Sequence, residues 1–397
     1  MAGPLSGVRV VDLTSVVSGP FATMFLADQG ADVVKVEPLG GDITRRSRQS
    51  VDPTGQFSAL FISTNRGKRS IAVDLKQPEG IEIVRRLIGR ADVLVQNFRP
   101  QVMERLGLGE PAMRALNPRL IYVSISGAGD SGPYAEKRVY DPIVQALSGF
   151  ADVQAEAKTR RPQMIRTIVA DKTTSVMTAQ AVASALYARE KSGEGQHIKV
   201  AMLDVMIAYL WPEGMMQYTV VGQEASAIDP NARPDLIFQT LDGYLTVGTI
   251  SDSEWQGFCR ATERPDLIED KRFSTPGARA ANGAERIHLM GEILAKRTTA
   301  DWLVRLDDAD VPCAPVLRRG EVMANEQVVA RGLIREFDHP GIGRVRQAKP
   351  AAEFSATPTR PPSPAPKIGE HGREILAELE YGEAEIDRLG QGKVVRL

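Results

Sequence analysis

An aspartate before a helix-forming segment is the residue of this sequence best suited to covalent chemistry. Asp171 follows the apolar residues 168–170 and precedes the run KTTSVMTAQAVASAL. An aspartate at that place caps a helix, and the positive end of the helix dipole keeps its carboxylate ionised. Carboxylates also act as covalent nucleophiles. The residue types therefore leave two interpretations open: a helix cap, and a charged nucleophile beside a cleft.

Six cationic residues stand just outside predicted strands. Ligands of open α/β sheets bind at the carboxyl ends of the strands, where such cations would suit a polyphosphorylated ligand. The alternative is an ordinary solvated surface. The six residues are Lys68, Arg69, Lys76, Arg99, Arg105 and Arg138.

A glycine-rich run follows one predicted strand. Gly127–Gly132 reads GAGDSG and matches G-x-G-x-x-G. Pro133 and Tyr134 come next, and no apolar helix opens there to receive a pyrophosphate. Because the dinucleotide fingerprint depends on that helix, a nicotinamide dehydrogenase is disfavoured. A loop at a strand end, which lets a ligand approach the backbone, is the alternative.

Alternating short strands and helices must position these residues. Runs rich in Val, Ile and Leu predict strands, and an amphipathic helix at Gln77–Arg90 and an apolar helix at Lys172–Arg189 lie between them. This alternation predicts an α/β domain with a parallel sheet covered on both faces. The predicted strands are Val8–Leu13, Ala31–Glu37, Ser70–Leu75, Ala91–Gln96, Leu120–Ser126 and His197–Met202.

The pattern changes after Met202 and predicts a second, smaller α+β domain. We expect a large domain at 1–200 and 335–397, a linker helix at 201–225 and the small domain at 226–334. The proline-rich stretch from Glu353 favours extended structure. Trp211, Trp255 and Trp302 are expected in cores. The other predicted elements are helices Asp204–Tyr218, Ser253–Thr262, Ala284–Lys296, Thr299–Asp308 and Glu370–Tyr381, and strand Tyr244–Val247.

Composition narrows the class of protein. The 397 residues include 49 Lys and Arg against 50 Asp and Glu, which argues against a nucleic-acid binder. Two cysteines exclude a disulfide framework and fit a reducing compartment. Neither a secretory signal nor a membrane span is evident, so a cytoplasmic location is expected. Four dispersed histidines predict no metal site.

Several motifs, in this order, resemble the class III CoA-transferase family, which includes formyl-CoA:oxalate CoA-transferase, carnitine CoA-transferases and α-methylacyl-CoA racemase. The resemblance implies a Rossmann-like large domain, a small domain and an interlocked homodimer. It also implies acyl-CoA and carboxylic acids as substrates, with no tightly bound cofactor, no nucleic acid and no membrane as partner. The motifs are PLSGVRVVDLTSVVSGPFATMFLADQGADVVKVE, NRGKRSIAVDLKQPEG, ADVLVQNFRPQVMERLGL, GPYAEKRVYD, VADKTTSVMTA, SGEGQHIKVAMLD and HPGIGRVRQAKP.

The same resemblance assigns roles to residues. The nucleophilic aspartate falls on Asp171, and Val17 and Ser18 lie beside the thioester. Contacts to the nucleotide of CoA fall on Val73, Asp74, Leu75, Lys76, Asn97, Phe98, Arg99, Arg105 and Arg138. Arg160, Arg161 and Arg166 are candidates for the acceptor carboxylate, and Gly127, Gly129 and Gly132 for shaping the oxyanion region.

The expected activity is the transfer of CoA from an acyl-CoA thioester to a carboxylic acid through a covalent aspartyl intermediate. Tyr140 is a further candidate for CoA binding, with its hydroxyl lining the cleft. The racemase branch has a histidine–aspartate pair where this sequence has Tyr140 and Asp141. Tyrosine, with a pKa near about 10, is a poor base at neutral pH, so a transferase is favoured over a racemase. Val17 stands where the oxalate enzyme has glutamine, which disfavours oxalate as acceptor. A racemase and a non-catalytic acyl-CoA-binding protein remain alternatives.

Overall fold

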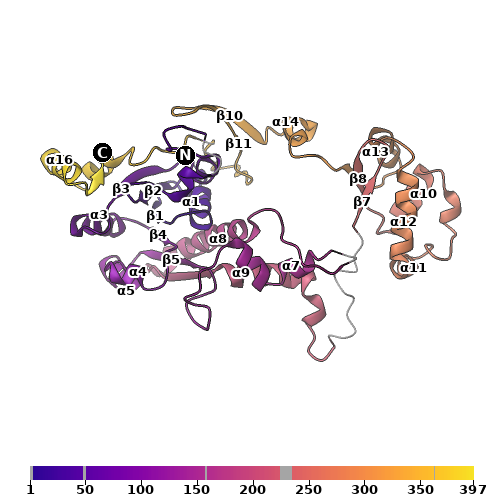
Figure 1. The fold of residues 1–397 in the computed structure, drawn as a ribbon, viewed down its shortest axis with the longest axis horizontal. Helices are drawn as coiled ribbons and strands as arrows, with labels where there is room; N and C mark the ends of the chain where they lie inside the picture. The colour runs from indigo at the N-terminus through magenta and orange to yellow at the C-terminus, as the bar shows by residue number, and fades with distance from the viewer. Residues whose placement is uncertain (1–2, 48–50, 157–158, 224–234, 362) are drawn as a thin grey trace. The chain divides into compact units, whose positions relative to one another are not determined.

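The chain forms two compact units in this computed structural model (Figure 1). The structure describes residues 3–47, 51–156, 159–223, 235–361 and 363–397. One unit contains residues 1–224 and 332–397, and the other contains residues 225–331. The boundary predicted between residues 225 and 226 lies outside the described residues, as does part of the predicted small domain before residue 235.

A seven-stranded sheet forms the centre of the larger unit, in the order β12-β3-β2-β1-β4-β5-β6. All neighbours pair in parallel except β12, which runs antiparallel to β3. The order reverses direction between β1 and β4, as in doubly wound α/β folds. The predicted α/β class with its parallel sheet is thus confirmed. The strands are β1 Arg9–Leu13, β2 Asp32–Glu37, β3 Arg69–Val73, β4 Val93–Gln96, β5 Ile121–Ser126, β6 His197–Ala201 and β12 Val395–Arg396.

Helices cover both faces of this sheet because its strands are apolar on both sides. Helices α1 and α8 lie on one face (Figure 1). They pack against apolar side chains of β1, β2, β4 and β5. The remaining helices of the sheet cover the other face. The bounds are α1 Ser18–Asp28 and α8 Val169–Ser192 on the first face, and α3 Pro78–Gly89, α4 Val102–Arg105, α5 Glu110–Leu116, α15 Gly372–Glu378 and α16 Glu383–Gln391 on the second.

A smaller apolar cluster joins α6, α7 and α9 to the start of α8. The helix predicted as a linker therefore lies within the larger unit, as α9. Trp211 on α9 is 43% exposed, so its expected core position was wrong, whereas Trp255 and Trp302 are buried as predicted. Pro212 and Glu213 have non-helical backbone angles and interrupt α9 near its end. The bounds are α6 Asp141–Leu147, α7 Phe150–Val153, α9 Met202–Gly214 and a 3-10 helix at Met216–Tyr218.

The C-terminal part of the chain returns to the sheet. The hairpin β10–β11 contributes Ile342 and Val345 to a cluster with Phe57 and Phe61. Residues 353–361 and 363–366 contain neither helix nor strand, in line with the predicted extended segment. The buried Arg45 guanidinium donates a hydrogen bond of 3.0 Å to the carbonyl of Pro366 and so fixes the end of that segment. The bounds here are a 3-10 helix at Ile43–Arg46, α2 Ala59–Thr64, β10 Ile334–His339 and β11 Gly343–Ala348.

The second unit packs helices on a three-stranded antiparallel sheet of order β7-β8-β9. Its core contains Trp255, Phe258, Phe273 and Trp302. None of the helices in the described parts of the chain is both long and apolar enough to cross a membrane. The bounds are β7 Ile237–Gln239, β8 Tyr244–Val247, β9 Cys313–Pro315, α10 Asp252–Ala261, α11 Pro276–Ala281, α12 Gly283–Leu294, α13 Thr299–Asp308, α14 Glu326–Ala330 and 3-10 helices Pro265–Leu267 and Glu321–Ala324.

Candidate active site

A cavity of about 330 Å³ opens at the carboxyl ends of β1, β4 and β5. Ser15 and Val16 follow β1, and Asn97–Pro100 follow β4. Ser126 is the last residue of β5, and Gly127 follows it. The reversal of strand order between β1 and β4 splays the loops there apart, and ligands of doubly wound sheets bind at that crevice. The cavity lies entirely within the larger unit.

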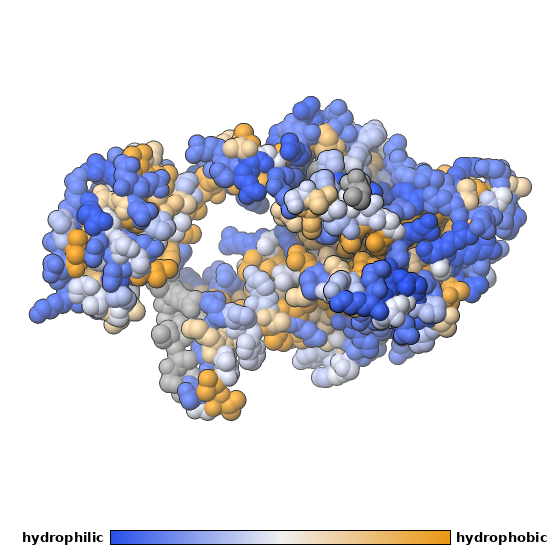
Figure 2. Space-filling model, turned by 180° about the vertical axis from the view of Figure 1, so that it is seen from behind, coloured by the Kyte–Doolittle hydropathy of each residue, from blue (hydrophilic) through white to orange (hydrophobic). Residues whose placement is uncertain are grey.

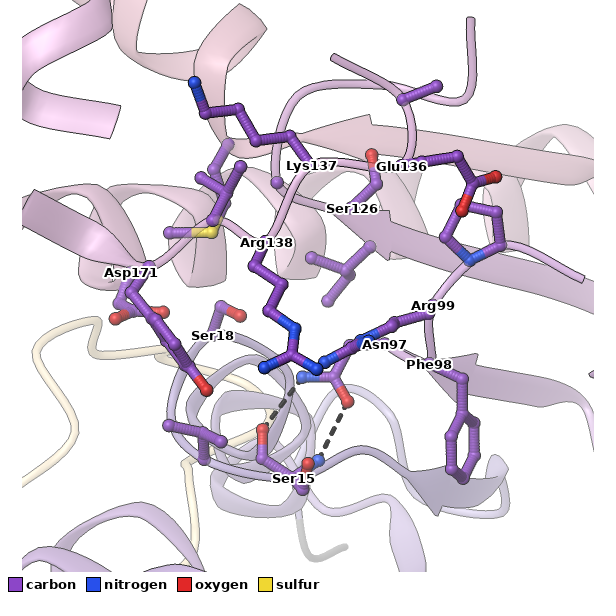
Figure 3. A pocket seen from close by; sticks show the side chains of 18 residues that line it. Ser15, Ser18, Asn97, Phe98, Arg99, Ser126, Glu136, Lys137, Arg138 and Asp171 are labelled. Carbon is purple, nitrogen blue, oxygen red and sulfur yellow. Dashed lines mark hydrogen bonds between the residues drawn. The ribbon is translucent and has the colours of Figure 1, made fainter. Parts of the chain in front are cut away.

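Asp171 reaches this cavity from the first turn of α8 (Figure 3). The helix begins at Val169, so Asp171 is its third residue and not the predicted cap. Asp141, at the start of α6, supplies the cap instead. One oxygen of its buried carboxylate accepts hydrogen bonds from the backbone N–H groups of Ala170, at 2.7 Å, and of Asp171, at 3.1 Å. The Asp171 side chain is consequently free to face the cavity.

The surroundings of Asp171 raise its pKa from 3.8 to about 6. Burial is the largest cause, because an ionised carboxylate loses hydration, and the nearby negative charge of Asp141 adds to it. Hydrogen bonds from the Ser18 hydroxyl and backbone N–H lower the pKa and partly oppose both effects. The group is still about 90% ionised at pH 7, since that pH lies about one unit above its pKa.

Two arginines place positive charge opposite Asp171. The side chains of Arg99, after β4, and Arg138, before α6, converge in the cavity above Ser15 and Asn97 (Figure 3). Neither arginine forms a salt bridge with another described residue. Asn97 is fixed by two hydrogen bonds with the Ser15 backbone, of 2.9 and 2.8 Å. Two guanidinium groups without acidic partners among the described residues have the charge and geometry that suit an anionic ligand.

The cavity brings together part of the predicted site. Seven predicted residues line it: Ser18, Asn97, Phe98, Arg99, Arg138, Tyr140 and Asp171. Gly127 also lines it, whereas Gly129 lines a neighbouring cavity. The following predicted residues do not line it: Val17, Val73, Asp74, Leu75, Lys76, Arg105, Gly132, Arg160, Arg161 and Arg166.

The outlying residues lie in different surroundings. Val17 is buried at the start of α1, and Val73 is buried in the core. Asp74–Lys76 follow β3, where the Asp74 carboxylate accepts from the backbone N–H of Lys76 at 3.0 Å. Arg105 is exposed at the end of α4. The partly buried side chains of Leu75 and Phe98 pack against the same core cluster, which relates the loop after β3 to the loop after β4.

Two of the six predicted ligand cations have internal partners instead. The Lys68 ammonium is buried, 2.9 Å from an oxygen of Asp12. Arg69 forms ion pairs with Asp32, at 2.6 Å, and with two glutamates of α15. The prediction that Lys68 and Arg69 hold a ligand was therefore wrong, because both are neutralised by acidic side chains that are distant in the sequence.

Sequence reasoning missed several lining residues, among them Ser15, Val16, Lys137 and Met202. Val16 has a backbone φ of 70°, a left-handed conformation that β-branched residues rarely adopt. A valine at this position therefore gives no reason to predict that conformation from the sequence. Asp141 was noted only for its place next to Tyr140, and its cap on α8 depends on tertiary contact. In the described parts of the chain, no group of three or more His, Cys, Asp or Glu side chains could hold a metal ion.

Comparison with known proteins places the chain in a family. Residues 5–372 match the family model described as CoA-transferase family III. The chain is 38% identical over 385 residues to succinate–glutarate CoA-transferase of Agrobacterium fabrum, covering 95% of this chain and 96% of that one. It is 34% identical to succinyl-CoA:glutarate CoA-transferase of Mus musculus, covering 97% of this chain and 89% of the other.

A solved structure has the same fold. A CAIB/BAIF family protein from Brucella suis superposes with a TM-score of 0.83 at 35% identity, covering 96% of this chain and all of that one. The chain therefore belongs to CoA-transferase family III, and the resemblance of its motifs to that family is confirmed.

Proposed function

We propose that this family III CoA-transferase moves CoA from an acyl-CoA thioester to a carboxylic acid by covalent catalysis at Asp171. The observation that carries the proposal is the position of that carboxylate: it faces a cavity, lies beside Ser18, and stays mostly ionised at neutral pH with a pKa of about 6. Partial desolvation of an oxygen nucleophile makes it more reactive toward a thioester carbonyl.

The reaction exchanges acyl bonds without a net oxidation or reduction. An Asp171 oxygen attacks the thioester carbonyl carbon, the C–S bond breaks, and CoA leaves as thiolate, which gives a mixed anhydride on Asp171. The thiolate then attacks the Asp171 carbonyl of that anhydride, releases the donor acid and forms an aspartyl thioester. The acceptor carboxylate attacks this thioester and forms a new anhydride, from which returning thiolate takes the acceptor acyl group and frees Asp171.

The nucleotide part of CoA is proposed to bind the cations of the same edge of the sheet. Arg99 and Arg138 lack acidic partners among the described residues and would bind the phosphates, while the narrower part of the ligand reaches Asp171. Asn97 and Phe98 line the path between them. From there the adenine end is proposed to reach Val73–Lys76 and Arg105, in the loops after β3 and β4.

The acceptor proposed here is a short dicarboxylic acid. Both curated relatives described above carry succinate or succinyl-CoA together with glutarate in their names. The measurement is a matrix of acyl-CoA donors against mono- and dicarboxylic acids, with the CoA products identified by mass spectrometry.

The test of covalent catalysis uses Asp171→Asn, which keeps the size of the side chain and removes the nucleophile. We expect loss of CoA transfer of at least about 1,000-fold with CoA binding retained, and loss of the hydroxylamine-trapped adduct at residue 171. The matched control is Asp301→Asn, because Asp301 occupies the same third position of α13 in the other unit. Transfer by Asp171→Asn at a rate near that of the wild type would refute the proposal.

A racemase is the rival activity within the family resemblance. No histidine is among the described residues that line the cavity, and Tyr140 is 67% exposed at its edge. Among the described residues of the cavity, Asp171 therefore has no imidazole beside it to act as the second base of a racemase. Incubation of a chiral 2-methylacyl-CoA in heavy water, without any acceptor acid, separates the two: deuterium incorporation would favour the racemase.

An interlocked homodimer is proposed as the assembled form. Large apolar side chains lie exposed on α8 and α9 of the larger unit, among them Val176, Met177, Tyr187, Tyr209 and Trp211. Figure 2 shows such apolar side chains exposed on the surface of that unit. Exposed apolar patches of this kind mark subunit interfaces. Interlocked chains would not exchange subunits with a differently tagged copy until both are unfolded, which native mass spectrometry can detect.

A further inference from the structure

A buried carboxylate organises the loop that precedes α1. The Asp12 side chain, on β1, is completely buried. One of its oxygens accepts from the backbone N–H and the hydroxyl of Thr14, at 2.9 and 2.5 Å, and the other accepts from the Thr23 hydroxyl at 2.7 Å. The Lys68 ammonium donates to that second oxygen at 2.9 Å. Every donor except Lys68 belongs to the loop or to α1.

Lys68 also holds the other end of this loop. Its ammonium donates to the carbonyl of Pro20, in the first turn of α1, at 2.8 Å, and to the side-chain oxygen of Asn65 at 2.8 Å. All three hydrogens of the ammonium are thereby used, and none reaches the cavity. Lys68 therefore clamps the two ends of the segment Thr14–Pro20 through Asp12 and a carbonyl.

The clamped segment contains a strained residue. Val16, in its middle, has a φ of 70°, and a β-branched residue is strained in this left-handed conformation. Such strain persists only where surrounding contacts impose it. Close packing adds to the constraint, because a Cβ atom on Gly19 would lie 2.3 Å from the Thr14 side chain.

The strained segment presents Ser18 to the reacting carboxylate. Ser18 and Asp171 line the same cavity, and the nearby hydroxyl and N–H of Ser18 lower the pKa of the Asp171 carboxyl. The Ser175 hydroxyl, one turn further along α8, lies 2.7 Å from the Ser18 carbonyl and 2.8 Å from the Asp171 carbonyl. The Ser175 hydroxyl thus joins the start of α1 to the turn of α8 that carries Asp171, so a shift of the loop before α1 would change the surroundings of the Asp171 carboxylate.

We propose that Lys68, acting through Asp12, is a positioning residue that holds the strained Thr14–Pro20 loop so that Ser18 orients Asp171 for attack. This inference rests on the proposed role of Asp171. A lysine that only stabilised the fold would serve equally well at either end of α1. The geometry assigns Lys68 to the catalytic end, because two of its three acceptors, the Asp12 carboxylate and the Pro20 carbonyl, hold the loop and the first turn of α1, while the third, Asn65, follows α2.

The chain provides a matched control at the opposite end of α1. Arg66 is also buried and donates to both oxygens of Asp28, the last residue of α1, at 3.0 and 2.7 Å. Its remaining bonds reach the carbonyl of Ala348 and the side chain of Gln347, away from the cavity. Lys68→Met and Arg66→Met therefore each remove a buried cation that contacts α1. Only Lys68→Met removes the contacts that hold the Thr14–Pro20 loop.

The experiment compares steady-state CoA transfer, CoA affinity and pH profiles of these two variants. For Lys68→Met we expect kcat to fall about 100-fold, as for other small misplacements of reacting groups, with the dissociation constant of CoA within twofold of wild type. For Arg66→Met we expect kcat within about threefold of wild type.

The pH profile gives a second readout. Displacement of Ser18 moves the acid limb of kcat/KM to higher pH in Lys68→Met only, because Ser18 lowers the pKa of Asp171. The other titratable groups of the cavity, common to both variants, are Arg99, Glu136, Lys137, Arg138 and Tyr140, with Asp141 behind Asp171.

Equal effects of the two variants on kcat, or an unchanged acid limb in Lys68→Met, would overturn the inference. If Lys68→Met fails to fold, Thr14→Val and Thr14→Ser decide: valine keeps the shape but loses the hydroxyl bond to Asp12, and serine keeps the bond. Valine keeps the backbone N–H bond to Asp12 and loses only the hydroxyl bond, so we then expect about a tenfold lower kcat for the valine variant alone, and equal rates refute the clamp. Asp171→Asn, assayed beside them, separates the proposals, because an active Asp171→Asn refutes the nucleophile whatever Lys68 does.

Discussion

Removing the charge of Asp171 is expected to stabilise the folded chain while it abolishes transfer. The pKa of this carboxyl is 3.8 in its ordinary state and about 6 in the fold, so the folded state disfavours the ionised form. Below pH 3.8 the carboxyl is protonated in both the folded and the unfolded chain, so its raised pKa does not change the free energy of unfolding. Above pH 6 it is ionised in both states, and the folded chain is then destabilised by the full amount. The difference of about 2.2 units corresponds to about 3 kcal/mol at 1.36 kcal/mol per unit, an upper limit for a partly exposed group.

The replacement Asp171→Asn keeps an acceptor for the Ser18 N–H and removes the charge that burial and Asp141 oppose. The free energy of unfolding should therefore rise at pH 8 by up to about 3 kcal/mol, and by about half as much at pH 5, where the folded group is mostly protonated. Urea unfolding of wild type, Asp171→Asn and Asp301→Asn at both pH values measures this. Equal or lower stability of Asp171→Asn at pH 8, or a gain independent of pH, would show that the carboxylate is not strained by its site.

Three further perturbations test the parts of the site. Asp141→Asn removes the negative charge beside Asp171 but keeps an acceptor for the backbone N–H groups at the start of α8. The acid limb of the kcat/KM pH profile should therefore move down by up to about one pH unit. Because burial is the larger cause of the shift, the pKa of Asp171 should stay above 3.8. Arg138→Ala should weaken CoA binding about tenfold or more in titration calorimetry, with a weaker salt dependence, because a charge-assisted contact to phosphate is lost. Gly19→Ala should lower the free energy of unfolding by about 1–3 kcal/mol and also lower kcat, since the new methyl group meets the Thr14 side chain; unchanged urea unfolding and turnover would contradict the tight loop.

Most of the secondary structure of the larger unit could be predicted from local sequence. The runs Val8–Leu13 and Ala91–Gln96 match β1 and β4 within two residues, because a buried parallel strand is apolar on both faces. The ends of helices were less predictable. The helix expected from Lys172 begins at Val169, since its cap is Asp141, which lies 30 residues earlier in the chain. A cap supplied by another element leaves no signal at the start of the helix itself.

Charge was the least reliable guide to the site. Lys68 and Arg138 are both cations next to a strand or a glycine-rich loop, and the sequence treats them alike. In the fold, Lys68 is neutralised by Asp12, whereas Arg138 faces the cavity without an acidic partner among the described residues. Which of the two can bind an anion depends on where acidic side chains from distant strands come to lie.

The strand segments, the family and the choice of Asp171 as the proposed nucleophile follow from local patterns: apolar runs of strand length, and motifs that follow one another along the chain. The reactivity of that aspartate is not. Its pKa depends on burial, on the charge of Asp141 and on hydrogen bonds from Ser18, which is more than 150 residues away in sequence. Only folding brings these groups together, because the electrostatic environment of a side chain depends on distances in space.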